Sequence, residues 1–142
     1  MRGDFDGDGK LDATVFRPSN VVWYIRQSSN NQLRTAHWGL PTDKFVPADY
    51  DGDGKTDLAV FRSGTWYIRQ SSYNQPRYVS WGANADKPVP ADYDGDGETD
   101  VAVNRGGVWY LLESASGQMR ATQFGTTQDA PVQAAGFLYS NE

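Results

Sequence analysis

DYDGDGKTD, residues 49–57, places four aspartates within nine residues and separates them with two glycines. Like charges at this density repel one another and oppose folding. Nearly the same stretch occurs earlier as DFDGDGKLD (residues 4–12) and later as DYDGDGETD (residues 92–100). The threefold recurrence predicts a chain built from repeated units, each with one acidic loop.

Two spacings set the length of the repeated unit. The first aspartates of the three stretches are 45 and 43 residues apart, whereas Trp23, Trp66 and Trp109 are 43 residues apart each time. The two extra residues of the first unit therefore lie between Arg17 and Trp23, where the chain reads PSNVV and the second unit has only SGT. We expect this insertion at the tip of a hairpin.

Each unit contains four short segments rich in β-branched and aromatic residues. In the middle unit they are FVPAD (45–49), DLAVFR (57–62), TWYIRQ (65–70) and PRYVSWG (76–82). Turn residues separate them, and none has the 3.6-residue period of a helix. Four strands in about 43 residues, repeated, are typical of a propeller blade. The fold class predicted is therefore all-β, with about three four-stranded antiparallel β-propeller blades per chain and one extra C-terminal strand.

The chain is expected to be one propeller-repeat domain over residues 1–142. Its repeats are placed at approximately 1–44, 45–87 and 88–130, with a partial fourth repeat at 131–142. Segments such as DLAVF and WYI are apolar on both faces, as in strands that are covered on both sides. We therefore interpret the Trp-Tyr pairs as core between blades rather than ligand-stacking residues; they are Trp23/Tyr24, Trp66/Tyr67 and Trp109/Tyr110.

Composition excludes several classes of protein. The 142 residues are 38% hydrophobic and 13% aromatic and contain no cysteine, which excludes disulfides, thiolate catalysis and cysteine-ligated zinc. The basic residues are scattered singly, so no nucleic-acid surface is expected. No apolar run is long enough for membrane insertion. No signal peptide is visible, so the chain is either cytosolic or begins after a removed leader or inside a longer protein.

Numbered from Asp49, the loop has carboxylates at positions 1, 3, 5 and 9, Gly54 at position 6 and the carbonyl of Lys55 at position 7. Ca²⁺ takes six to eight oxygen ligands, whereas Mg²⁺ seldom uses an all-protein cage. Position 12, where a helical EF-hand has glutamate, is Val60. The loop should therefore join two strands. The alternative for a single copy is an ordinary acidic β-turn, which three complete copies disfavour.

The stretch WGLPTDKFVPADYDGDGKTDLAVFR (residues 38–62) resembles the FG-GAP/VCBS repeats of integrin α-subunit propellers and of many bacterial extracellular proteins. Trp-Gly at 38–39 and 81–82 and Phe-Gly at 124–125 stand where that family has Phe-Gly. The resemblance implies three calcium ions per chain and an extracellular or cell-surface location. The metal ligands it implies are Asp4, Asp6, Asp8, Lys10, Asp12, Asp49, Asp51, Asp53, Lys55, Asp57, Asp92, Asp94, Asp96, Glu98 and Asp100, with Lys10, Lys55 and Glu98 acting through their main-chain carbonyls.

The chain departs from this family at two places. The Gly-Ala-Pro element is replaced by FRP (16–18), FRS (61–63) and NRG (104–106), which weakens the analogy to integrin ligand recognition. In the fourth unit, Ala135, Phe137 and Tyr139 stand at the positions of three aspartates, so no ion is expected there.

No set of catalytic residues is evident, and we expect no enzyme activity. His37 is the single histidine, and we expect it to be a strand residue rather than a base. Arg2-Gly3-Asp4 spells an integrin-binding tripeptide, but Asp4 is also the first residue of an acidic loop and cannot easily serve both roles.

Two functions follow from these observations. The first is a non-catalytic calcium-binding module for extracellular recognition of carbohydrate or a protein surface, with Trp38, Trp81, Arg26 and Arg69 as candidate contacts. The second is a purely structural, calcium-stiffened or self-assembling unit of a larger extracellular protein. Three blades are fewer than a closed propeller needs. The expected partner is therefore the chain itself, as a homo-oligomer with a dimer favoured, or the missing blades of a longer chain.

Overall fold

A computed structural model describes residues 2–72 and 75–132, and these residues form three four-stranded antiparallel sheets and no helix. The predicted all-β class is therefore confirmed. None of the described residues forms a helix that is long and apolar enough to cross a membrane. The strands are β1 (Arg2–Gly3), β2 (Asp12–Arg17), β3 (Val22–Arg26), β4 (Leu33–His37), β5 (Lys44–Phe45), β6 (Leu58–Arg62), β7 (Thr65–Arg69), β8 (Pro76–Ser80), β9 (Lys87–Pro88), β10 (Val101–Arg105), β11 (Val108–Leu112) and β12 (Met119–Gln123).

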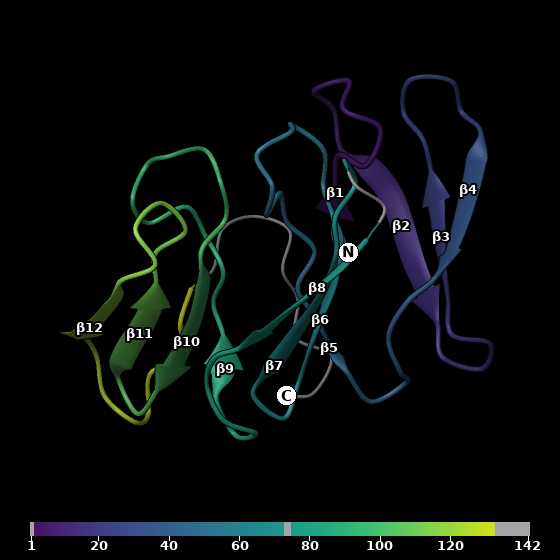
Figure 1. Cartoon of the computed structure of the whole chain (residues 1–142). Helices are drawn as coiled ribbons and strands as arrows, with labels where there is room; N and C mark the ends of the chain where they lie inside the picture. The colour runs from purple at the N-terminus through teal and green to yellow at the C-terminus, as the bar shows by residue number, and fades with distance from the viewer. Residues whose placement is uncertain (1, 73–74, 133–142) are drawn as a thin grey trace.

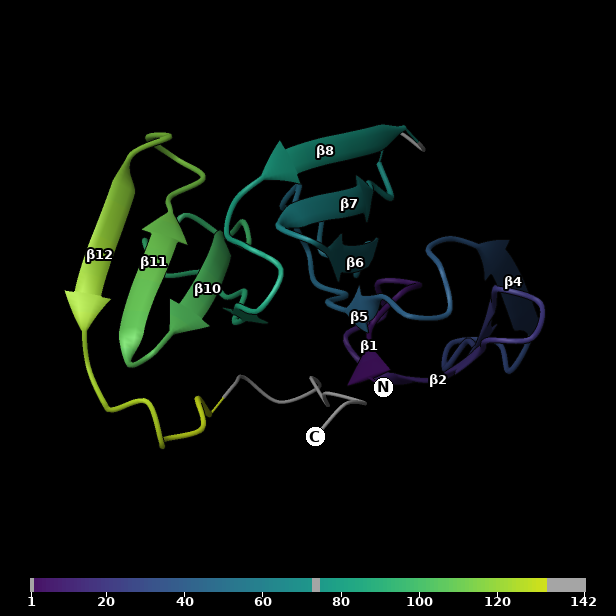
Figure 2. The same ribbon diagram turned by 90° about the horizontal axis from the view of Figure 1, so that it is seen from below.

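The sheets follow one another along the chain, and each contains four consecutive strands in sequence order. Figure 1 shows the three sheets side by side. In Figure 2 the first strands β1, β5 and β9 lie toward the middle of the array, while β4, β8 and β12 lie outside. This is how blades are arranged around an axis. The described sheets do not close a ring, so the propeller itself is a proposal.

Hairpin geometry confirms the insertion in the first unit. In the middle sheet Arg62 pairs with Thr65 across a two-residue turn, and both turn residues have positive φ, as a type I′ turn requires. In the first sheet Arg17 pairs with Val22, so four residues form the turn. Val21 there has a φ of 60°, which is unusual for a β-branched residue.

The first strand of each unit is shorter than predicted. FVPAD (45–49) was expected to be a strand, but β5 covers only Lys44–Phe45, and pairing resumes at an isolated bridge between Ala48 and Asp57. Pro47 lies in this gap, where the carbonyl of Val46 accepts a hydrogen bond from the hydroxyl of Tyr50 at 2.6 Å. The predicted C-terminal strand, with Ala135, Phe137 and Tyr139, lies outside the described residues except for Pro131 and Val132.

The core lies between the sheets. Trp23 and Trp66 are fully buried, as predicted for residues between blades, whereas Trp109 on the third sheet is only half-buried. Four successive residues of β6 are buried, since the middle sheet is covered on both faces, and four successive residues of β10 in the third sheet are buried as well. β2 instead alternates between buried and exposed residues, since one face of the first sheet is open.

Candidate metal sites

The first aspartate of each loop holds the loop in shape. Asp49 Oδ1 accepts hydrogen bonds from the backbone N–H groups of Gly52 (2.7 Å) and Asp53 (3.2 Å), and its Oδ2 accepts one from Gly54 (2.9 Å). Gly52 and Gly54 have φ of 73° and 84°, a conformation that glycine adopts without strain. Asp4 and Asp92 make the same three bonds. The three loops therefore have one conformation.

Carboxylates at positions 1, 3 and 5 converge in every loop. One oxygen from each lies within 4.8 Å of the other two. Oxygens bound at about 2.4 Å from one Ca²⁺ ion lie at most about 4.8 Å apart. The described residues therefore provide an all-oxygen donor set that fits calcium. The three triplets are Asp4, Asp6 and Asp8; Asp49, Asp51 and Asp53; and Asp92, Asp94 and Asp96.

The position-9 aspartate is buried beneath the loop. Asp57 is 1% exposed, and its two oxygens accept the backbone N–H groups of Tyr50 (2.8 Å) and Ser71 (2.7 Å). Asp12 and Asp100 make equivalent bonds. A carboxylate has about four lone-pair sites, so these bonds leave room for an ion. The ligand role of the three position-9 aspartates stays a prediction.

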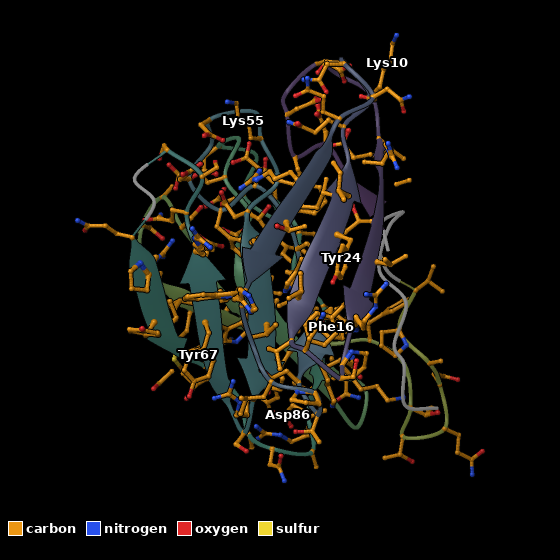
Figure 3. All side chains as sticks on the ribbon, turned by 90° about the vertical axis from the view of Figure 1, so that its right-hand side faces the viewer. Lys10, Phe16, Tyr24, Lys55, Tyr67 and Asp86 are labelled. Carbon is orange, nitrogen blue, oxygen red and sulfur yellow. The ribbon has the colours of Figure 1, made fainter. Side chains whose placement is uncertain are left out.

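Position 7 lies at the turn of the loop. The backbone N–H groups of Lys10, Lys55 and Glu98 each donate to the position-5 carboxylate at 2.8–2.9 Å. Lys10 and Lys55 mark two acidic loops at the same end of the molecule, while Asp86 lies at the opposite end (Figure 3). These bonds place the backbone N–H of position 7 beside a converging carboxylate, and the ligand role of the three carbonyls stays a prediction.

In every unit, serine from the hairpin between the third and fourth strands donates to a converging carboxylate, which was not predicted from the sequence. Ser71 Oγ donates to Asp53 Oδ2 (2.6 Å), and Ser72 Oγ donates to Asp51 Oδ2 (2.5 Å). Ser28 and Ser29 do the same in the first unit. In the third unit Ala115 stands in place of the second serine and offers only its backbone N–H, 3.3 Å from Asp94. The recurring QSS at 27–29 and 70–72 was the available signal.

Burial and hydrogen bonding shift the pKa values of these carboxylates in opposite directions. Burial raises the pKa of Asp57 to about 6, and burial also raises the pKa of Asp49. For Asp51, burial opposes ionisation, but hydrogen bonds from Ser72 outweigh it and lower the pKa. The Ser29 hydroxyl likewise lowers the pKa of Asp6. A cation would stabilise the charged form of all four groups.

Neighbouring loops are joined by backbone hydrogen bonds. The N–H of Thr56 in the second loop donates to the carbonyl of Asp4 in the first at 2.7 Å, and the N–H of Thr99 donates to the carbonyl of Asp49 at 2.9 Å. Each loop therefore contacts the next at its first aspartate, so the three sites form one row.

The four candidate ligand contacts occupy different surroundings. Trp38 and Trp81 lie half-buried at the two junctions between sheets. Their Nε1–H groups donate to the carbonyls of Tyr67 and Tyr110, both at 3.0 Å. Arg26 is exposed, while Arg69 lines a small cavity of about 30 Å³. The tryptophans thus hold neighbouring sheets together, and a contact with an external ligand stays a prediction for all four residues.

One comparison with known proteins found a match. A family model for the FG-GAP-like repeat matches residues 4–60 and 49–103, which together cover most of the chain and include all three acidic loops. Searches of curated proteins and of solved structures found no match.

Proposed function

The chain belongs to the FG-GAP-like repeat family, and on that premise we propose that it is a calcium-binding, non-catalytic module of β-propeller type. The observation that carries this proposal is the convergence of three carboxylates in each of three loops with the same conformation. The family is generally a non-enzymatic repeat module, and its repeats typically occur in extracellular proteins. An extracellular or cell-surface location is accordingly part of the proposal.

Each loop would hold one ion through carboxylates at positions 1, 3, 5 and 9 and the carbonyl at position 7, giving three ions per chain. A bound calcium ion supplies positive charge that offsets the repulsion between the aspartates. The loop connects the first and second strands of its sheet, and the hairpin serines reach it from between the third and fourth strands. An ion would therefore tie all four strands of a blade at one end.

The first test is thermal unfolding with and without calcium. Free Ca²⁺ at 100 times its Kd adds about 2.7 kcal/mol per site when the ion binds only the folded state. That is a large share of a typical total of about 5–15 kcal/mol. We expect calcium to raise the Tm and EDTA to lower it by many degrees. An unchanged melting curve would rule out the metal sites.

A second test separates the loops by calorimetry. Asp51→Ala should lower the stoichiometry from three ions to two, and Asp94→Ala should do the same, because each removes a carboxylate from a single loop. Ala135→Asp is a matched control: it adds a carboxylate to the fourth unit, where Phe137 and Tyr139 still occupy ligand positions, and should create no site. Loss of all three ions after one substitution would contradict separate sites.

Stiffening of the repeat array is the role of calcium that we favour, because backbone hydrogen bonds join each acidic loop to the next. Recognition of carbohydrate or a protein surface is a second candidate, favoured by the exposed guanidinium-bearing Arg26 on β3. A glycan array probed with the calcium-loaded protein distinguishes them for sugars. Binding to particular glycans that Arg26→Ala abolishes would support recognition. Absence of binding to every glycan on the array would favour the structural role.

A further inference from the structure

The two junctions between neighbouring sheets are built alike. At each junction a tryptophan at the end of one sheet donates its indole N–H to the next sheet, as described above for Trp38 and Trp81. The glycine after each tryptophan lies against a valine of the next sheet. A Cβ at Gly39 would be 3.0 Å from Val60, and one at Gly82 would be 2.8 Å from Val103. Both valines are completely buried.

An ion pair follows each junction. Asp43 accepts a bidentate pair of hydrogen bonds from Arg62, both at 2.6 Å, and Asp86 accepts the same pair from Arg105. In both cases the aspartate closes the connecting turn and precedes the first strand of the sheet, while the arginine ends the second strand. The pair therefore fixes the start of each new sheet.

The third sheet ends with residues equivalent to those of the two junctions, but no further described sheet follows it. Phe124 replaces the tryptophan and is 76% exposed, and the space beside Gly125 contains Asp129 but no valine. Asp129 closes its turn through the N–H of Thr126 at 2.8 Å, as Asp43 and Asp86 close theirs, yet it pairs with no arginine of the described chain. A groove of about 490 Å³ opens here, lined by Trp109, Phe124, Asp129 and Val132 among others.

The first sheet presents the complementary parts. Val15 corresponds to Val60 and Val103 but is 59% exposed. Arg17 corresponds to Arg62, stacks 4.4 Å from the ring of Tyr24 as Arg62 stacks on Tyr67, and pairs with no carboxylate among residues 2–72 and 75–132. β2 pairs with β1 only through Asp12 and Ala13, so no described strand pairs with its edge from Val15 to Arg17. Figure 3 looks onto this sheet.

We propose that the groove of the third sheet binds the open face of the first sheet of a second copy of this chain. Val15 and Tyr24 of the second copy occupy the groove, and its Arg17 pairs with Asp129. The segment 129–132 then lies along the open edge of β2, as Asp43 and β5 lie along β6. The contact is head to tail, and two such contacts close a ring of two copies.

A second copy fits better than an unrelated protein because both halves of the junction occur on one chain and are complementary in charge and shape. Each residue of the proposed contact has an equivalent in the two junctions within the chain. The contact between copies would therefore repeat the packing already seen between neighbouring sheets. The proposal goes beyond calcium binding, since it rests on the ends of the array and on none of the acidic loops.

Light scattering and sedimentation of the full chain test the contact. We expect the wild-type protein to be a dimer at micromolar concentration. Arg17→Asp or Asp129→Arg places like charges across both junctions and should weaken association by about 30-fold or more. An equimolar mixture of the two variants should recover the dimer, because each junction then contains one arginine and one aspartate. This recovery also shows that both variants are folded.

Arg120→Asp is the matched control, since Arg120 is an exposed arginine of β12 that lies 3.6 Å from Glu113 and takes no part in the contact. It should leave the dimer unchanged. A wild-type chain that stays monomeric, or a mixture of the two charge variants that fails to associate, would overturn the proposal. Association that both single variants retain at full strength would overturn it equally.

Discussion

Aspartate has three distinct roles in this chain, and its neighbours decide which. At loop position 1 it accepts three backbone N–H groups and shapes the loop, as Asp49 does. At position 9 it is buried under the loop and bridges two segments, as Asp57 does. Before the first strand of a sheet it pairs with arginine, as Asp86 does. Residue type alone therefore does not define a ligand here.

The Asp86–Arg105 pair should make stability depend on acid pH. The hydrogen bonds from Arg105 hold the pKa of Asp86 below its usual value, against the effect of burial. Because the folded pKa is depressed, this stabilisation is complete above the unfolded pKa of about 3.9 and is lost as pH falls through the folded value. The Lys44 ammonium and the N–H of Ala83 also face this carboxylate and favour its charged form.

Arg105→Gln tests this dependence. Arg105 is half-exposed, so we expect a modest loss of about 1 kcal/mol at pH 7. The difference between wild type and variant should shrink below about pH 4. Urea unfolding of both proteins across this pH range, in the presence of EDTA, measures that difference. A difference that stays constant down to pH 2 would contradict a contribution from Asp86 ionisation.

At the scale of the element, the hairpins were largely predictable. The positions of β6, β7 and β8 agree with the predicted segments to within one or two residues at each end. The reason is that each strand is a run of β-branched and aromatic residues bounded by turn residues. The resemblance to FG-GAP repeats is also confirmed. The first strand was predicted too long, because the bond from the Tyr50 hydroxyl to the carbonyl of Val46 exists only in the folded loop and leaves no pattern in the strand itself.

The contacts between elements were not predictable in the same way. The serines that donate to the acidic loop are 18–21 residues away from their partners in the middle unit, and only the folded sheet brings them together. The indole bond from Trp38 to the carbonyl of Tyr67 crosses between two sheets. The pattern of apolar and polar residues along a single strand does not indicate which residues of another sheet it will contact.

The hairpin serines should tune the affinity of the proposed calcium sites. Ser72→Ala removes the hydroxyl that holds Asp51, and loss of a partner that orients a ligand typically costs 10–100-fold in metal affinity. We expect a loss of about tenfold at the second loop. The reverse substitution, Ala115→Ser, supplies the hydroxyl missing from the third loop and should strengthen that site. Calcium titration by calorimetry measures both, and unchanged affinity in both variants would show that the serines only shape the hairpin.

For the whole molecule, the important asymmetry is between the covered middle sheet and the two open ends. The middle sheet packs on the first through Leu58 and Val60 and on the third through Phe61 and Trp66. The third sheet has its own small cluster of Val89, Ala102 and Leu111 on the side away from the middle sheet. An array of this kind is stabilised mainly by contacts between neighbours.

Equivalent tryptophans should therefore differ in their contribution to stability. Trp66→Leu removes a ring that is 0% exposed and should cost about 3 kcal/mol or more, near the lower end for truncating a buried aromatic residue. Trp109→Leu alters a half-buried ring and should cost about half as much. Denaturant unfolding compares the two variants at a protein concentration at which sedimentation gives the mass of a monomer. Equal losses would mean that the open face of the third sheet is covered in solution.

The backbone hydrogen bonds between neighbouring acidic loops have a consequence for the proposed binding of calcium. The carbonyl of the first aspartate in one loop accepts a hydrogen bond from a backbone N–H of the next loop. An ion that fixes either loop would therefore also restrain its neighbour. The middle loop has a neighbour on both sides, while each outer loop has one. Occupancy should consequently rise over a narrower range of free calcium than for three unrelated sites, with a Hill coefficient above 1. The protein would then behave as a threshold sensor of calcium in its surroundings, rigid above a certain concentration and loosened along its whole row of loops below it.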